Sequence, residues 1–346
     1  MIFYFLFLLF ITSIIYAMEK RGKIVWPGIF LILFLISALR ADGMGADFES
    51  YREVYSQIND GYKGYEILYS YLNIICSSLG GYRAVVTLVS CLSLVGVIYF
   101  TKHNSLKPSV SIWLYITLGF YTWTFTIYRQ AVAISLILFA YEFARRKKPI
   151  QFILFILLAT GFHSLSILMI VMYPMLNIKV VKKLWAPVSI VFLTFLILFQ
   201  NSLLSMISFV SGLFGQRFAY YSFAATETSG ETLALLYLMV FLGVVLLTVQ
   251  AGPKTKEQNT DIMIFSSLTS ACQIIAMTFP LANRMGLFFA VPTFLLLPNI
   301  IENEFDNQSK RLCYLFIMIV SIAFFALLLY QDVISSATLV PYEFIW

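Results

Sequence analysis

The sequence predicts an all-α, polytopic membrane protein. Of its 346 residues, 60% are apolar and only 12% are charged, whereas about 25% of residues are charged in soluble domains. Apolar runs recur from Ile2 to Tyr330, and a helix needs about 20 such residues to cross a bilayer. The runs are continuous rather than alternating, which favours helices over barrel strands. We therefore expect a single integral membrane domain over residues 1–346.

The remaining composition excludes other classes. The first run, residues 2–17, lacks the basic start and the cleavage pattern of a signal peptide, so we expect it to be an uncleaved span. The net charge of +6 comes from basic residues in short loops, where membrane orientation explains them without a nucleic-acid partner. The four cysteines are scattered and predict neither a disulfide framework nor a zinc site.

Basic clusters predict the topology, because lysine and arginine gather on the cytoplasmic side of short loops. The clusters are Lys20/Arg21/Lys23, Lys102/Lys107, Arg145–Lys148, Lys179/Lys182/Lys183, Lys254/Lys256 and Lys310/Arg311. The chain must leave and return between them, which predicts about twelve crossings with both termini outside. The expected spans are 2–18, 24–39, 82–101, 109–126, 130–144, 149–161, 164–176, 185–201, 231–251, 261–279, 285–300 and 312–330.

The outer face is built from two longer segments and a hairpin. The segments are residues 40–81 and 202–230, and the first contains a tyrosine-rich stretch, GYEILYSYLN, that suits a helix at the membrane interface. Residues 149–176 have a basic cluster at each end, so a single crossing is excluded. A hairpin of two short helices resolves this conflict, and its tip, TGFHS, places His163 in the outer half of the membrane.

Arginines depart from the orientation rule. Those expected on the outer side are Arg40, Arg52, Arg83, Arg129, Arg217 and Arg284. Arginine within a membrane is costly and is usually paired or functional, and its planar fork matches phosphate and carboxylate groups. Arg129 and Arg284 could instead snorkel to headgroups, His163 could be a buried structural histidine, and the tyrosines could be an aromatic belt. The predicted location of these arginines and His163 on one side of the membrane favours a shared site.

Such a site suits an anionic lipid headgroup, above all a diphosphate. The arginines could stabilise a leaving diphosphate as its charge develops, so the chemistry would need no metal or other cofactor. His163, Asp47 or Glu66 could take the proton from an attacking hydroxyl. Asp42 and Glu49 are simpler to interpret as solvated loop acids.

Six motifs occur in an order that resembles the EpsG family of exopolysaccharide polymerases, a branch of the Wzy-type O-antigen polymerases. They are RADGMGADFESY, which begins at Arg40, then GYEILYSYLN, YRQAVAIS, LLATGFHSLSIL, FGQRFAYYS and NRMGLFFAV. The resemblance covers about residues 37–300 and assigns the family's polar positions to Arg40, Asp47, Arg129, His163, Arg217 and Arg284. GYEILY departs from the expected Glu-x-Gly-Tyr pattern, which leaves the equivalence of Glu66 open.

The resemblance implies a GT-C-like glycosyltransferase fold at the outer face of a bacterial inner membrane. It also implies transfer of a growing glycan from undecaprenyl diphosphate onto a lipid-linked repeat unit, with membrane lipids and a chain-length regulator protein as partners. The predicted catalytic residues are His163, Asp47 and Arg129, and the predicted substrate-binding residues are Arg40, Arg217, Arg284, Glu66, Gln130 and Tyr51. A flippase for lipid-linked oligosaccharide and a membrane acyltransferase are the alternatives.

Overall fold

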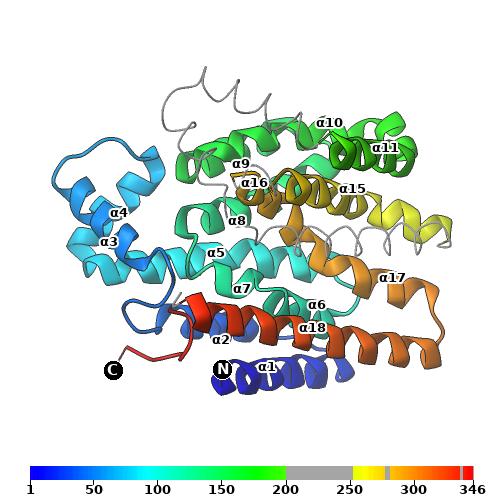
Figure 1. Cartoon of the computed structure of the whole chain (residues 1–346), viewed down its shortest axis with the longest axis horizontal. Helices are drawn as coiled ribbons and strands as arrows, with labels where there is room; N and C mark the ends of the chain where they lie inside the picture. Colours follow the sequence, from blue (N-terminus) through cyan, green and yellow to red (C-terminus); the bar gives the residue numbers. More distant parts are fainter. Residues whose placement is uncertain (200–251, 277–280, 336–337, 346) are drawn as a thin grey trace. The chain divides into compact units, whose positions relative to one another are not determined.

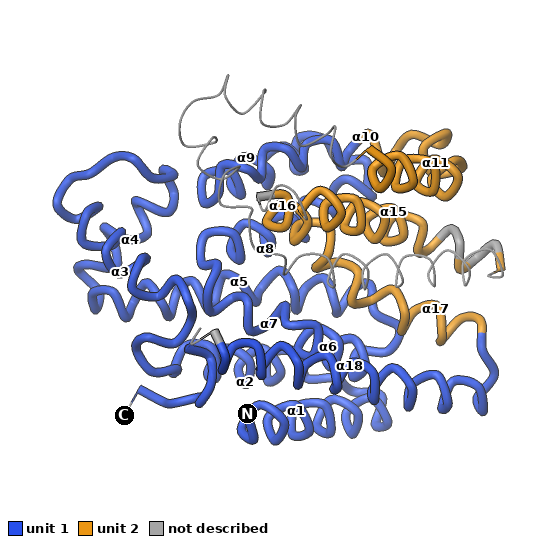
Figure 2. The backbone as a smooth tube through the Cα atoms, viewed as in Figure 1, with its two compact units in different colours: residues 1–173, 305–346 blue, residues 174–304 orange. Residues whose placement is uncertain are grey.

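A computed structural model describes residues 1–199, 252–276, 281–335 and 338–345. The described residues form helices and no strands, as Figure 1 shows, which confirms the predicted all-helical class. The chain divides into two compact units (Figure 2). Unit 1 comprises residues 1–173 and 305–346, and unit 2 comprises residues 174–304.

Five stretches of described helix are long and apolar enough to cross a membrane. They are Ile2–Lys20 (α1), Tyr82–Asn104 (α5), Lys179–Leu198 (α11), Ala282–Glu304, and Asn307–Ile334 within α18 (Asn307–Ser335). Further apolar helices, such as Trp26–Ala38 (α2), are shorter. The helical membrane protein is thus confirmed, while the larger number of crossings stays a prediction.

The centre of unit 1 is a layer of packed helices in which α5 contacts both α2 and α8 (Tyr128–Arg145). The sequence predicts one span over 109–126, but the structure divides it into α6 (Pro108–Thr117) and the short α7 (Phe120–Trp123). The break falls at Gly119, whose φ of +82° lies in the left-handed region. Glycine adopts this conformation without steric cost, so the chain turns there and α7 starts as a separate helix.

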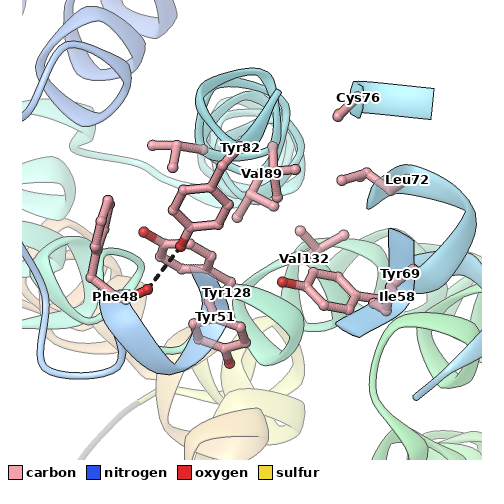
Figure 3. Packing of buried hydrophobic residues seen from close by; sticks show 12 residues of the cluster. Phe48, Tyr51, Ile58, Tyr69, Leu72, Cys76, Tyr82, Val89, Tyr128 and Val132 are labelled. Carbon is pink, nitrogen blue, oxygen red and sulfur yellow. Dashed lines mark hydrogen bonds between the residues drawn. The ribbon is translucent and has the colours of Figure 1, made fainter. Parts of the chain in front are cut away.

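Two helices form within residues 40–81, the first segment predicted on the outer side. Residues Ile67–Leu79 form α4, the helix predicted at the interface, whereas α3 (Phe48–Asn59) was not predicted. In α3, Phe48, Tyr51 and Ile58 are buried at helical spacing. They join a core with residues of α4, α5 and α8, shown in Figure 3. This aromatic core holds α3 against the ends of the longer helices.

The hairpin predicted over residues 149–176 is interrupted where the sequence indicates. Helix α9 (Pro149–Phe162) ends before His163, which has an extended backbone with φ −150° and ψ 112°. The chain continues as a 3-10 helix, η1 (Ser164–Val171), which packs back on α9, and then as α10 (Met172–Asn177). His163 therefore lies at the turn between two arms.

In unit 2, α11 packs against α15 (Pro253–Ala276). An ion pair joins the two helices, with Lys182 Nζ 2.6 Å from the buried Asp261 Oδ1. The segment after α15 is α16 (Leu281–Ala290), followed by a 3-10 turn, η2 (Val291–Leu295), and α17 (Leu296–Glu304). Pro292 at the start of η2 has no N–H to continue the α-helical pattern.

Residues 342–345 form hydrogen bonds with the end of α2 and with the polar stretch that follows it. Ala41 N donates to Glu343 O at 2.9 Å, and Ile345 N donates to Leu39 O at 3.0 Å. The Tyr342 hydroxyl also donates to Ile36 O at 2.6 Å. These bonds fix the backbone on either side of Arg40 within unit 1.

Candidate functional site

Glu66 is the centre of a polar cluster in unit 1. Its Oε2 lies 2.5 Å from Arg129 Nη1, and its Oε1 accepts a hydrogen bond of 3.2 Å from Ser164 N. His163 Nδ1 lies 3.9 Å from the same Oε1. We call Glu66, Arg129, His163 and Ser164 the Glu66 cluster. It unites three residues that the sequence predicts as functional but places on separate segments.

Three element ends position this cluster. Glu66 is the N-cap of α4, with an extended backbone, and its carbonyl accepts the Ser70 N–H at 2.9 Å. Arg129 lies in the first turn of α8, and His163 lies between α9 and η1. Helix ends leave backbone groups and dipole charge available to side chains. The fold therefore brings the polar ends of α4, α8 and η1 to one place.

The cluster is largely sheltered from solvent. The side chains of Glu66, Arg129 and His163 are 14%, 26% and 11% exposed. Burial alone would raise the pKa of Glu66, but the Arg129 guanidinium and the N–H of Ser164 outweigh it and bring this pKa below its ordinary value. Glu66 is therefore a carboxylate at neutral pH, and its charge is balanced by Arg129.

Tyrosines surround the Arg129 guanidinium. Its central carbon lies 5.9 Å from the ring centroids of Tyr51 and Tyr69 and 5.7 Å from that of Tyr65. A guanidinium within about 6 Å of an aromatic face is attracted by the ring quadrupole. The three rings and Glu66 together hold Arg129 in one orientation, so little order has to be imposed when a ligand binds.

Arg40 lies inside unit 1 and is 0% exposed. Its Nη2 donates to the Tyr128 hydroxyl at 2.8 Å and its Nη1 donates to Ser90 Oγ at 3.2 Å and to the Ser37 carbonyl. The Tyr128 ring in turn stacks on Tyr51, with centroids 4.5 Å apart (Figure 3). The sequence predicts that Arg40 binds a headgroup directly. In this structure the guanidinium supports the aromatic layer beneath Arg129, and headgroup binding by Arg40 stays a prediction.

The other members of the RADGMGAD motif shape the same region. Gly45 has a φ of +111°, and a Cβ there would overlap the carbonyl oxygen of Phe125. Asp47 is the N-cap of α3, and its backbone carbonyl accepts the Tyr51 N–H at 2.9 Å. Gly45 thus permits the close approach of the loop to the α7–α8 connection. Asp47 begins the helix that carries Tyr51.

The EpsG family model matches residues 23–344 of the chain. The chain belongs to the EpsG family. This match includes all the residues of the Glu66 cluster, and membership indicates a polysaccharide polymerase-type role. Comparison with curated proteins and with solved structures found no match.

Three further residues were predicted for the site of this EpsG-family chain. Gln130 is buried within α8 and is 3% exposed. Arg284 lies on α16 in unit 2 and is exposed. Arg217 lies outside the residues that the structure describes. Their part in the site stays a prediction.

Further contacts of the EpsG-family chain were not anticipated. Asp42, predicted as a solvated loop acid, lies 3.3 Å from Arg83 Nη1 and 3.5 Å from Arg52 Nη2. Both of these arginines, which the sequence predicts on the outer side, therefore have a carboxylate partner. Tyr65 and Tyr69 contact Arg129, a role that the aromatic-belt interpretation of the tyrosines does not include. The contact through Ser164 uses its backbone N–H, which no side-chain pattern indicates.

In the described ranges, no group of three or more His, Cys, Asp and Glu side chains is arranged to hold a metal ion.

Proposed function

We propose that this EpsG-family protein polymerises lipid-linked oligosaccharide repeat units. In the proposed reaction, a hydroxyl of the non-reducing sugar of one repeat unit attacks the anomeric carbon of the growing glycan. The bond from that carbon to undecaprenyl diphosphate breaks, and the hydroxyl proton passes to a base. The products are a glycan longer by one unit and undecaprenyl diphosphate. The reaction takes place at the outer face of a bacterial inner membrane.

The observation that carries this proposal is the pairing of a fixed cation with a histidine–carboxylate pair in the Glu66 cluster. The edge of the Arg129 guanidinium that does not face Glu66 suits an oxygen of the diphosphate. A guanidinium that is already oriented can stabilise the charge that develops on the leaving group. Arg217 and Arg284 are proposed as further diphosphate ligands.

In the same proposal, His163 is the general base. When substrate binds, the Glu66 carboxylate accepts Nδ1–H of the ring, so Nε2 is the nitrogen that accepts the proton of the attacking hydroxyl. The Nδ1 to Oε1 distance of 3.9 Å is longer than a hydrogen bond, and catalytic hydrogen bonds of this kind shorten when substrate binds. Asp47 is the alternative base, because it lies one helical turn before Tyr51.

A flippase is the second candidate, and α15 is the observation that favours it. This helix buries polar side chains along its length, among them Asn259, Ser266 and Gln273, and polar groups inside a membrane bundle often follow a substrate path. The polymerase is preferred because the Glu66 cluster offers a base beside a cation, which transport of an intact lipid does not require.

The experiment is a deletion strain complemented with variants, with the surface glycan displayed as a length ladder. Deletion should leave glycan of one repeat unit, and His163→Ala should not restore the ladder, whereas His103→Ala, at the exposed second histidine, should restore it. A normal ladder in the deletion strain would refute the polymerase. Complete absence of surface repeat units would favour the flippase, and full-length polymer lacking an acyl group would favour the acyltransferase.

A further inference from the structure

The loop between α3 and α4 presents an exposed aromatic ring next to the Glu66 cluster. Tyr62 is 49% exposed, and Figure 1 shows this loop at the edge of unit 1. The centroids of the Tyr62 and Tyr65 rings are 5.5 Å apart in an edge-to-face arrangement. Tyr65 also contacts the Arg129 guanidinium. One continuous aromatic surface therefore leads from solvent to the cluster.

The loop holds Tyr62 in place. Tyr62 N donates to Gln57 O at 2.9 Å, and Gly61 N donates to Ile58 O at 3.1 Å, so the backbone is fixed to the end of α3. The Tyr62 ring lies against Gly64, where a Cβ would overlap the ring carbons and the hydroxyl. Tyr65 is held by a 3.0 Å bond from its hydroxyl to Gln57 Oε1. Both rings are thus ordered before any ligand arrives.

The surroundings of Tyr62 are polar. Asn59, Asp60 and Lys63 are all exposed on the same turn. The exposed apolar residues of this region begin only with Ile67 and continue on α4 at Tyr71 and Ile74. An exposed ring among amide and carboxylate groups does not suit an acyl chain. It suits a ligand with an apolar face and a polar rim, and a sugar ring has both.

We propose that Tyr62 and Tyr65 form a saccharide-binding subsite in which Tyr62 stacks on a sugar ring of the lipid-linked repeat unit. The inference rests on the proposed function, and it adds where the glycan is held. The C–H face of the sugar packs on Tyr62, and its hydroxyls face the polar groups of the loop. The next sugar along then reaches the Glu66 cluster beside Tyr65.

The test measures how tightly full-length variants, purified in lipid nanodiscs, bind the free repeat-unit oligosaccharide. This oligosaccharide is obtained from the deletion strain, where mild acid releases it from the carrier lipid. Tyr62→Leu keeps an apolar side chain but removes the ring, and it should weaken binding about tenfold, as truncation of a tyrosine contact commonly does. Tyr62→Phe should bind within about twofold of the original chain because the ring is kept. Tyr71→Leu is the matched control, since Tyr71 is 56% exposed on α4.

Equal binding by Tyr62→Leu and the original chain would overturn the subsite, and so would equal losses in Tyr62→Leu and Tyr71→Leu. Gly64→Ala provides an independent variant that displaces the ring without removing it, and it should weaken binding in the same direction. The proposed function fails separately, through a normal ladder in the deletion strain. Normal binding by Tyr62→Leu, with no ladder in the deletion strain, would refute the subsite alone.

Discussion

Glu66→Gln tests the central contact of the cluster. Two opposite charges about 4 Å apart near a protein surface attract by about 4 kcal/mol, and the cost of desolvating a partly buried pair offsets much of this. Glutamine keeps the size of the side chain and an acceptor oxygen, so we expect a net loss of about 1–3 kcal/mol. In a chain of 346 residues that loss corresponds to a fall in Tm of about 1–4 °C.

The assay is thermal unfolding in detergent at neutral pH for Glu66→Gln, Arg129→Gln and the double variant. Because the two side chains are in contact, the double variant should lose less stability than the sum of the single losses, by about 1–2 kcal/mol. All three should fail to restore the glycan ladder. Arg52→Gln is the control, because its exposed pair with Asp42 is worth about 0–1 kcal/mol. Additive losses, or a full ladder with Glu66→Gln, would refute the reasoning.

Three further predictions concern pH, backbone and charge. Although burial opposes it, Arg129 and the Ser164 N–H lower the pKa of Glu66 below its ordinary 4.5. The stability that this carboxylate contributes is therefore present above pH 4.5 and is lost as pH falls through the folded-state pKa. When Tm is measured from pH 7 to 3, it should decline more in the original chain than in Glu66→Gln. Gly45→Ala should lower Tm and weaken the ladder more than Gly43→Ala, because both glycines have positive φ but only Gly45 meets a backbone oxygen; equal effects would contradict the close approach to Phe125. Arg284→Lys should shorten the ladder if Arg284 binds the diphosphate with both arms of its fork, since lysine offers only a point charge, and an unchanged ladder would remove Arg284 from the site.

The sequence predicts which side of the membrane a charge occupies, but it does not predict the partner of that charge. Basic clusters assign Arg129 and His163 to the outer side, and opposed clusters around residues 149–176 predict the break at His163. They do not indicate that the single carboxylate of Asp42 pairs with both Arg52 and Arg83, because these residues lie on a loop, on α3 and on α5 and meet only in the folded chain. The sequence also does not show how deeply a side chain is buried. Arg40 follows an apolar helix, which is compatible with a position at the rim of a site as well as with full burial.

Charge balance limits what the Glu66 cluster can do alone. Glu66 and Arg129 sum to zero when both are ionised, so the pair orients a guanidinium without supplying net positive charge. Arg129 can still donate hydrogen bonds to a leaving diphosphate, but balancing the charge of that group also requires cations that no carboxylate cancels. Arg40 lies beneath the aromatic layer and makes no ion pair within the described part of the chain. Its positive charge acts on the Glu66 cluster at a distance, because the protein interior screens charges poorly. Direct ligands with uncancelled charge must therefore come from other segments, for which Arg217 and Arg284 are the predicted candidates.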